Sequence, residues 1–518
     1  MNDKSTIAKS ARSVSIFTFL SRILGMVRDI VIASLFGAGQ VTDAFWVAFR
    51  IPNLLRRLFA EGALTVSFIP VFTSRLEHGG KEKAKVISDT IFTILVCLLI
   101  LISLIGIIFS PYIVKIFASG FSDEVFDLAV LLNRIMFPYI LFISLTALSM
   151  GILNSLKHFF APSFSPVLFN CCIILFAVVL HSNFDIPIVS LAIGVIIGGI
   201  LQFLFQIPFL KSRNFSFKPK LLFNNPDVKN IFTLIVPQIF GLAVYNLNII
   251  VNTQYASYLP EGTISYLFLS ERLVEFPLGI IAVSLATVLL PNFSSYISKG
   301  DLSKFRETYV SSIRILFYIL IPASIGLIAL SKPICNILYQ RGEFGYEQMI
   351  FTSQCLFGYA IGLWAVGLIR ITVPAFFAQK DTKTPVYVAL CAFILNAVLG
   401  YLLSFRFELN HLGLALASSA SSILNISLLI YFINKKIVKI EIADFLKYMS
   451  KIIIIGFIMG ISVFKISQLQ DWTESAFSLE KVFMLGLCVF VGLLVYSILS
   501  KLLKIEEFDK IIKIITNY

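Results

Sequence analysis

The sequence has few charged residues, and this shortage excludes a water-soluble protein. Only 14% of the 518 residues are charged, whereas 58% are hydrophobic, and the mean hydropathy is +0.90. A soluble domain with this balance would expose large apolar surfaces to water. Apolar runs long enough to cross a bilayer recur along the whole sequence and leave no room for a large soluble domain at either end. The composition therefore predicts a polytopic membrane protein.

The residue patterns of enzymatic and metal chemistry are also missing from the sequence. The seven cysteines are scattered, mostly within apolar segments, and form no CxxC pair, and the four histidines show no ligand spacing. There is no GxxxxGK[ST] loop, so direct use of ATP is not expected, and neither HExxH nor GxSxG occurs. We therefore expect no enzymatic activity, no metal site and no cofactor.

The first segment is not expected to be a cleaved signal peptide. Lys4, Lys9 and Arg12 precede an apolar stretch, as in a signal peptide. However, Arg22 interrupts this stretch, and no small-residue cleavage site follows it. The segment is better interpreted as a retained first helix.

The net charge of +13 is distributed by topology and does not indicate a nucleic-acid partner. Basic residues gather in alternate loops, for example within 81–85, 211–229 and 435–447, and the intervening loops, such as 123–127 and 343–347, are acidic or neutral. This alternation follows the positive-inside rule. It predicts a multi-pass inner-membrane protein with both termini in the cytoplasm. The basic loops are also expected to touch anionic membrane lipids.

These loops divide the sequence into segments of membrane-spanning length. We expect an all-α protein with about fourteen transmembrane helices, near residues 10–37, 43–75, 86–110, 127–155, 161–182, 187–211, 228–258, 263–297, 306–331, 346–378, 385–404, 411–434, 446–466 and 480–502. The second, eighth and tenth segments are longer than a bilayer requires, so these helices should tilt or project into the cytoplasm.

An internal repeat divides the sequence into two halves. Five residues of the second segment recur in the eighth with a displacement of 221 positions: Pro70, Phe72, Ser74, Gly79 and Lys83 match Pro291, Phe293, Ser295, Gly300 and Lys304. A weaker echo pairs Lys157 with Lys380, and Pro162 with Pro385. Both echoes fall at cytoplasmic helix ends, which predicts two parallel repeats related by a pseudo-two-fold axis along the membrane normal.

The repeat gives the expected domain organisation. Residues 1–220 should form an N-lobe of six helices, 221–438 a C-lobe of six helices, and 439–518 two extra C-terminal helices with a short cytoplasmic tail. Bundles built from such repeats usually alternate access to a cavity between their halves. The sequence therefore predicts a transporter.

Charged residues occur inside the predicted helices, where each costs about 2.5–3.5 kcal/mol at mid-bilayer. In the first helix, spacings of three and four place five residues on one stripe: Ser15, Thr18, Arg22, Gly25 and Asp29. Arg28 lies beside this stripe. The second helix carries Asp43, Arg50, Arg56, Arg57 and Glu61, with Pro52 expected to kink it, and the eighth carries Glu271, Arg272 and Glu275.

Four of these arginines form the candidate anion site: Arg22, Arg28, Arg56 and Arg272. If they converge, their guanidinium groups can bind phosphate in bidentate fashion, and Asp29 and Glu275 would orient or neutralise them in the empty state. The alternative is that the charges form structural ion pairs or snorkel to the interface; for Arg50 and Arg57 the two interpretations are equally open.

The secondary candidates are Asp43, Glu61 and Arg370. Asp43 stands near a predicted helix start, where a capping role is favoured over ligand contact. Arg370 is expected near the cytoplasmic rim, and Arg134 is a weaker candidate.

Six short blocks of the sequence resemble the signature of the MurJ (MviN) lipid II flippases. They are 21–29 (SRILGMVRD), 36–39 (FGAG), 42–45 (TDAF), 52–62 (PNLLRRLFAEG), 271–277 (ERLVEFP) and 381–385 (DTKTP). The likeness extends over the whole chain. It implies the fold of the multidrug/oligosaccharidyl-lipid/polysaccharide exporter superfamily, with two lobes around a cavity and an extra helix pair that forms a groove for a lipid tail.

The resemblance also implies a cargo. Family members move the undecaprenyl-pyrophosphate-linked peptidoglycan precursor, lipid II, from the cytoplasmic to the periplasmic leaflet. The important arginines of the family fall on Arg22, Arg28, Arg56 and Arg272, with acidic partners at Asp29, Asp43 and Glu275. Some relatives bind sodium through a carboxylate on the seventh helix. Here that helix offers only Asn246, Asn248 and Asn252, and the eleventh only Asn396, so sodium coupling is not expected.

Other functions remain open at this point. A polysaccharide-unit lipid flippase would share a basic cavity, whereas a drug/cation antiporter of the same superfamily would need a cavity dominated by carboxylates. A polytopic glycosyltransferase would need catalytic carboxylates on a large outer loop, and the predicted outer loops are short. We expect a monomer whose candidate protein partners are the cell-wall synthesis and division machinery.

Overall fold

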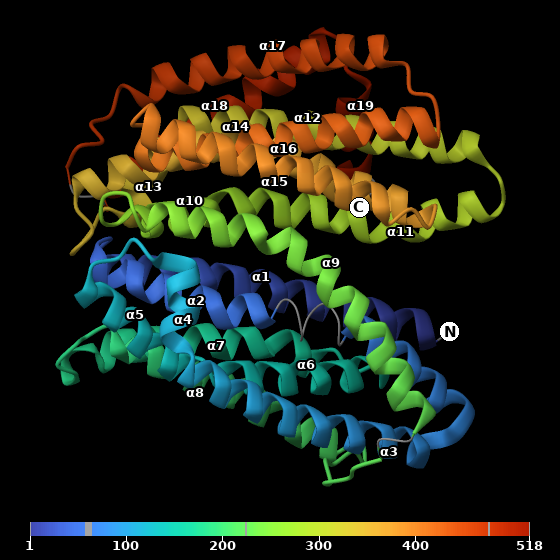
Figure 1. Cartoon of the computed structure of the whole chain (residues 1–518). Helices are drawn as coiled ribbons and strands as arrows, with labels where there is room; N and C mark the ends of the chain where they lie inside the picture. The colour runs from blue at the N-terminus through green and yellow to red at the C-terminus, as the bar shows by residue number, and fades with distance from the viewer. Residues whose placement is uncertain (1, 57–64, 223–224, 475–476, 517–518) are drawn as a thin grey trace. The chain divides into compact units, whose positions relative to one another are not determined.

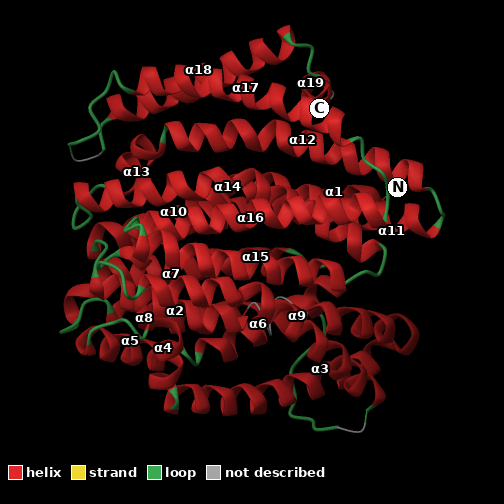
Figure 2. Ribbon diagram, turned by 45° about the horizontal axis from the view of Figure 1, so that its top comes forward, coloured by secondary structure: helices red, strands yellow, loops and turns green. Residues whose placement is uncertain are grey.

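The computed structural model describes residues 2–56, 65–222, 225–474 and 477–516, and it omits the side chains of 2–13, 65–66, 232, 234–245, 280, 283, 442 and 514–516. The described backbone is helical with connecting loops and contains no strand (Figures 1 and 2). The prediction of an all-α fold is confirmed. By its internal contacts the chain forms two compact units, Met1–Ile264 (unit 1) and Ser265–Tyr518 (unit 2).

Unit 1 is a bundle of long helices with two shorter ones. Its elements are α1 (Asn2–Phe36), α2 (Gln40–Arg56), α3 (Thr65–Ile108), α4 (Ser110–Ala118), α5 (Asp123–Met136), α6 (Tyr139–Ser155), α7 (Phe160–Val179), α8 (Val189–Lys211) and α9 (Pro226–Ala256). Helix α7 packs against α1 and α8, α6 packs against α3 and α8, α2 packs against α5, and α9 contacts α3 and α4. Within this bundle Arg28 and Asp29 of α1 and Asp43 of α2 are buried.

Unit 2 is a second bundle, built around α14. Its elements are α10 (Thr263–Pro277, whose first two residues belong to unit 1), α11 (Val283–Ser298), α12 (Leu302–Ala329), α13 (Ser331–Tyr339), α14 (Tyr346–Ala378), α15 (Lys383–Tyr401), α16 (Asn410–Lys436), α17 (Ile442–Ser467), α18 (Leu479–Leu502) and α19 (Glu506–Thr516). Helix α14 packs against α11, α12, α13 and α16, α15 packs against α16, and α17 joins the bundle through α12 and α18.

The break that the sequence predicts between the segments 43–75 and 86–110 is a kink within α3. It lies at Gly80, whose backbone is not helical, with φ 75° and ψ 172°. This conformation strains a residue with a Cβ atom, so glycine is what permits the bend. The predicted eighth helix is helical throughout and contains a π-helical turn at Leu278–Ala282, which links α10 to α11.

Ten helical stretches within the described residues are long and apolar enough to cross a membrane. They correspond to the predicted third to sixth and ninth to fourteenth helices. The first, second, seventh and eighth predictions overlap α1, α2, α9 and α10–α11 but are not among the ten, so the count of fourteen spans is not confirmed. Three of these four segments carry the charges that marked them for function.

The two units share backbone geometry at positions that the repeat pairs. Lys157 after α6 and Lys380 after α14 both adopt the left-handed conformation, with φ of 57° and 59°. In both turns a backbone N–H further along closes onto the preceding helix: His158 donates to Leu153 at 2.8 Å, and Asp381 to Phe376 at 3.0 Å. This is the Schellman pattern of helix termination. The lobe boundaries at residues 220 and 438 stay a prediction.

The turn after Lys380 is fixed by the DTKTP motif. The Asp381 carboxylate accepts hydrogen bonds from the Thr384 backbone N–H at 2.9 Å, from the Thr384 hydroxyl at 2.6 Å and from Lys436 Nζ at 3.2 Å. Burial opposes ionisation of Asp381, but the bonds from Thr384 and Lys436 outweigh it and hold the pKa of this carboxyl below its ordinary value. The motif therefore caps α15 and ties it to the end of α16.

Candidate functional site

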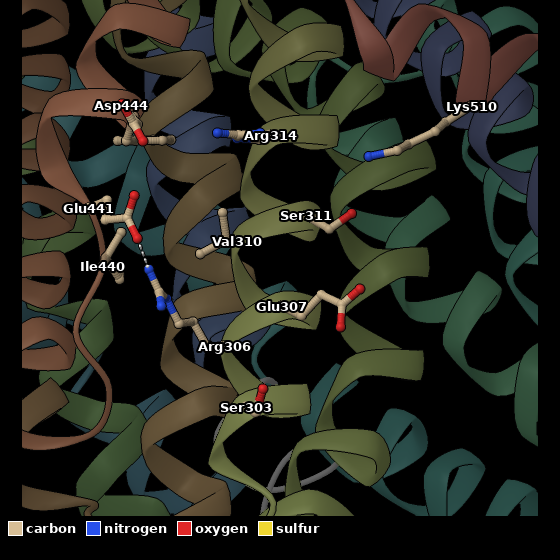
Figure 3. A pocket seen from close by; sticks show the side chains of 11 residues that line it. Ser303, Arg306, Glu307, Val310, Ser311, Arg314, Ile440, Glu441, Asp444 and Lys510 are labelled. Carbon is tan, nitrogen blue, oxygen red and sulfur yellow. Dashed lines mark hydrogen bonds and ion pairs between the residues drawn. The ribbon is translucent and has the colours of Figure 1, made fainter.

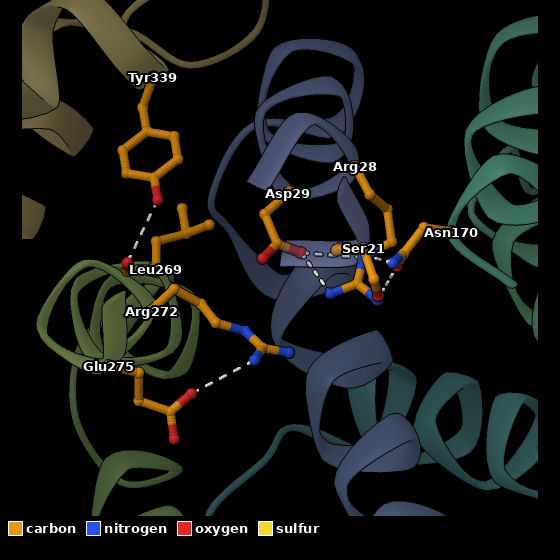
Figure 4. Close-up of polar contacts among 8 residues, drawn as sticks. All are labelled: Ser21, Arg28, Asp29, Asn170, Leu269, Arg272, Glu275 and Tyr339. Atoms are coloured by element: carbon orange, nitrogen blue, oxygen red, sulfur yellow. Dashed lines mark hydrogen bonds and ion pairs between the residues drawn. The ribbon is translucent and has the colours of Figure 1, made fainter. Parts of the chain in front are cut away.

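Arg28 is the most tightly held of the candidate arginines. It lies on α1 with only 4% of its surface exposed, and its neighbour Asp29 is 1% exposed. Arg28 Nε and Nη2 both donate to Asp29 Oδ1, at 3.0 and 2.7 Å, and Nη1 donates to Asn170 Oδ1 at 3.1 Å (Figure 4). Buried ions persist only when paired and hydrogen-bonded in this way. The guanidinium is therefore fixed in orientation.

Asn170 links this ion pair to the first part of α1. It lies on α7, where its Nδ2 donates to the Ser21 carbonyl at 3.1 Å while its Oδ1 accepts from Arg28. A Cβ atom at Gly25 would lie 3.8 Å from Asn170 Nδ2, so the α1 stripe passes close to this amide. The guanidinium also lies 5.8 Å from the ring centroid of Phe49 on α2. The site in unit 1 is thus built from α1, α2 and α7.

Arg272 occupies a more open environment in unit 2. On α10 its Nη1 lies 3.4 Å from Glu275 Oε2, and the two side chains are 38% and 39% exposed (Figure 4). The guanidinium stands over the Phe268 ring at 5.0 Å from the centroid. Tyr339 on α13 donates to the Leu269 carbonyl at 3.2 Å and holds this turn of α10. An ion pair this exposed contributes little to stability.

The remaining primary candidates are half-buried in unit 1. Arg22 lies on α1, and within the described residues its side chain makes no hydrogen bond or ion pair. Arg56 ends α2, and its Nε donates to Asn53 Oδ1 at 3.2 Å. The convergence of these two arginines and Arg28 with Arg272 remains a prediction.

The secondary candidates have different surroundings. Asp43 lies in the first turn of α2, where the sequence favours a capping role, but its buried carboxylate accepts a hydrogen bond from the Gly262 backbone N–H at 2.8 Å. Asp43 therefore lies at the start of α2, where a cap is expected, and also binds the backbone of a loop 219 positions away. Arg370 is half-buried on α14. Glu61, with Arg57, lies outside the described residues.

Two contacts were not predicted from the sequence. Arg50 Nη1 donates to the Thr253 hydroxyl on α9 at 2.6 Å, which favours the structural interpretation of Arg50. Asn170 is the partner of Arg28, and its only sequence signal is an amide within an apolar run. In the part of the chain that the structure describes, no three His, Cys, Asp or Glu residues are grouped in a way that could hold a metal ion.

The chain is similar to known proteins over nearly its whole length. The family model described as "Lipid II flippase MurJ" matches residues 32–484. A probable lipid II flippase MurJ from Vibrio cholerae is 37% identical over 515 residues, covering 96% of each chain. The lipid II flippase MurJ from Burkholderia cenocepacia is 38% identical over 430 residues, covering 82% of this chain and 83% of the relative.

Solved structures show the same relationship. The structure described as "Lipid II flippase MurJ, inward closed conformation" superposes with a TM-score of 0.78 at 29% identity, covering 95% of this chain and 98% of that one. An inward-facing multidrug-resistance MATE transporter of the MOP superfamily gives a TM-score of 0.66 at 14% identity, covering 79% and 93%, and shows that the fold is shared. The chain belongs to the MurJ lipid II flippase family.

Proposed function

We propose that this multi-pass membrane protein moves lipid II from the cytoplasmic to the periplasmic leaflet of the bacterial inner membrane by alternating access. It would act as a transporter and not as an enzyme. Membership of the MurJ family supports the cargo. The observation that carries the proposal at the level of residues is the buried Arg28, whose three donor nitrogens are held by Asp29 and Asn170.

The binding step follows from the chemistry of the arginines. A guanidinium presents two parallel N–H groups, which match two oxygens of a pyrophosphate. In our proposal Arg22, Arg28 and Arg272 bind the pyrophosphate of lipid II, and Arg56 adds positive charge, while the undecaprenyl tail remains largely in the bilayer. Asp29 and Glu275 would balance Arg28 and Arg272 when no cargo is bound.

The direction of transport has a candidate energy source. The pyrophosphate of lipid II is negatively charged, and the proposed movement to the periplasmic leaflet carries this charge out of a cell interior that is electrically negative. This step releases about 2.3 kcal/mol per charge per 100 mV. Flipping in sealed vesicles should therefore slow when the potential is collapsed with an ionophore; an unchanged rate would contradict the coupling.

Leaflet-specific labelling of lipid II tests the cargo. When the protein is depleted from cells, lipid II should accumulate on the cytoplasmic side, and normal exposure on the periplasmic side would refute the proposal. Arg28→Ala and Arg272→Ala should fail to restore exposure. Arg406→Ala is a matched control, because Arg406 is exposed and lies outside the candidate anion site. Restoration by either variant would refute the anion-site assignment.

A further inference from the structure

A polar pocket in unit 2 lies away from the arginines of the proposed cargo site. It has a volume of about 390 Å³ and is formed by α12, the start of α17 and α19 (Figure 3). This volume is within the range of small-ligand sites. Six charged side chains line it: Arg306, Arg314, Lys510, Glu307, Glu441 and Asp444. Three are basic and three are acidic, so the formal charges of the lining cancel.

One basic and one acidic residue of the pocket already satisfy each other. Arg306 Nη2 donates to Glu441 Oε1 at 2.6 Å, as Figure 3 shows. The hydrogen bond from Arg306 holds the pKa of Glu441 below its ordinary value, so this carboxylate stays ionised at neutral pH. This pair forms a neutral wall. The ligand chemistry must therefore come mainly from the other charges.

Arg314 and Glu307 present unsatisfied charges to the pocket. Within the described part of the chain, neither side chain has a hydrogen bond or an ion pair, and the buried Nε of Arg314 has no acceptor. The Arg314 guanidinium lies 5.2 Å from the Tyr448 ring centroid. The two residues are seven positions apart on α12, which is about 10 Å along the helix axis. The pocket thus offers a cation at one end and an anion at the other.

Lys510 adds another cation to the lining of the pocket, and its position depends on how α19 docks. Its Nζ lies 3.8 Å from Glu506 Oε2, one turn earlier on α19. The chain reverses at Lys504, which has φ 51°, and then buries Ile505 and Glu507, at 4% and 1% exposure. The Glu507 carboxylate lies beside the Tyr448 hydroxyl on α17. In Figure 3, Lys510 and Arg314 lie at the upper end of the pocket and Glu307 at the lower end.

We propose that this pocket binds the headgroup of a zwitterionic phospholipid of the phosphoethanolamine class. The phosphate would lie at Arg314 and Lys510, and the ammonium at Glu307. A ligand with net negative charge would meet the carboxylates of Glu307 and Asp444, whereas a zwitterion complements both ends. Arg314 and Glu307 stand about 10 Å apart along the axis of α12, so a headgroup with its phosphate and its ammonium at opposite ends can contact both.

The expected topology places Glu307 and Arg314 in the same order across the membrane as the ammonium and the phosphate of the lipid. Helix α12 follows the basic loop around Lys299 and Lys304, which the charge distribution places in the cytoplasm. Glu307, near the start of α12, is therefore closer to the cytoplasm than Arg314. In a phospholipid of the cytoplasmic leaflet, the ammonium likewise lies further from the acyl chains than the phosphate. The site relies on this topology and not on the identity of the transported cargo.

Native mass spectrometry of the full-length protein in detergent tests the site. The probes are phosphatidylethanolamine and phosphatidylglycerol with identical acyl chains, and inorganic phosphate. We expect phosphatidylethanolamine to be retained at least about fivefold better than phosphatidylglycerol, and Arg314→Gln to reduce this retention about tenfold. Glu307→Gln should abolish the selectivity, and Glu307→Lys should reverse it. Glu82→Gln and Lys83→Gln, at exposed positions of α3, should change nothing.

Three outcomes would overturn the proposal. In the first, the unchanged protein retains the two lipids equally. In the second, the Arg314 and Glu307 variants retain them as the Glu82→Gln control does. In the third, inorganic phosphate displaces phosphatidylethanolamine, and this displacement is lost in Arg314→Gln. Lys510→Gln, at an exposed position of α19, tests the phosphate contact without changing a buried residue. Thermal unfolding checks that each variant is folded. Leaflet labelling of lipid II with the same variants separates failure of this site from failure of the proposed transport.

Discussion

Replacing Arg28 by alanine should destabilise unit 1 strongly, because it removes the basic partner of a buried carboxylate. Asp29 is 1% exposed, and its Oδ1 accepts both hydrogen bonds of the ion pair. Breaking a buried pair by removing one member costs about 3–5 kcal/mol. Asn170 Oδ1 loses its donor as well. We therefore expect Arg28→Ala to lower the free energy of unfolding by about 4 kcal/mol.

The double variant Arg28→Ala/Asp29→Ala separates this effect from a simple loss of contacts. With both charges removed, no uncompensated ion remains, so the double variant should be more stable than Arg28→Ala alone. The coupling energy from the cycle of single and double variants should be about 2 kcal/mol or more. Denaturant titration of the purified protein in one detergent measures it, with Arg406→Ala expected within about 0.5 kcal/mol of the unchanged protein. If the losses of the two single variants simply add, the reasoning is refuted.

Three further changes test separate parts of the structure. Gly80→Ala forces a Cβ into a φ of 75° and should cost about 1–3 kcal/mol in a denaturant titration, whereas Gly326→Ala, with no heavy atom within 4 Å, should cost little; equal losses would contradict the strain at Gly80. Glu275→Gln should change the unfolding free energy by less than about 1 kcal/mol, because its ion pair is exposed, but should reduce lipid II exposure in the labelling assay; a large loss of stability would show a structural role. The folded-state pKa of Asp381 is depressed, so its contribution to stability is present above the unfolded pKa and disappears as the pH falls through the folded pKa. The melting-temperature difference between the unchanged protein and Asp381→Asn should therefore shrink below about pH 4, and a difference that persists at lower pH would contradict this.

The helical segments were predictable because apolar runs and charged loops alternate along the chain. The DTKTP motif and the paired Lys157 and Lys380 also carried correct local information, since both lysines end a helix in the left-handed conformation. The details within two helical elements were less predictable. The break between the second and third predicted segments is a kink at a single glycine, and the predicted eighth helix contains a π-helical turn at Leu278–Ala282. Local backbone torsions decide these points, and the hydrophobic pattern does not report them.

The partners of the candidate arginines were predictable only where they are neighbours in sequence. Asp29 is the next residue after Arg28, and Glu275 lies about one helical turn from Arg272, where helical periodicity places both on the same face. Asn170 is 142 positions from Arg28, and only the packing of α1 against α7 brings the two together. Glu507 shows the same limit, because α19 was expected to be a cytoplasmic tail, whereas this carboxylate is buried. Tertiary contacts between polar groups leave little trace in a single sequence.

The two arginines with acidic partners differ in what binding an anion would require of them. Arg272 is 38% exposed and pairs at 3.4 Å with a carboxylate that water also reaches, so it can accept a pyrophosphate oxygen while Glu275 turns to solvent at little cost. Arg28 has no such freedom. A guanidinium that is 4% exposed is covered by its neighbours, and its bonds to Asp29 and Asn170 use three of its five N–H groups. A cargo oxygen can therefore reach the other N–H groups only when the side chains around Arg28 move. In our proposal, therefore, contact with Arg28 requires a local rearrangement of α1 against α7, and this requirement links cargo binding to the movement of helices.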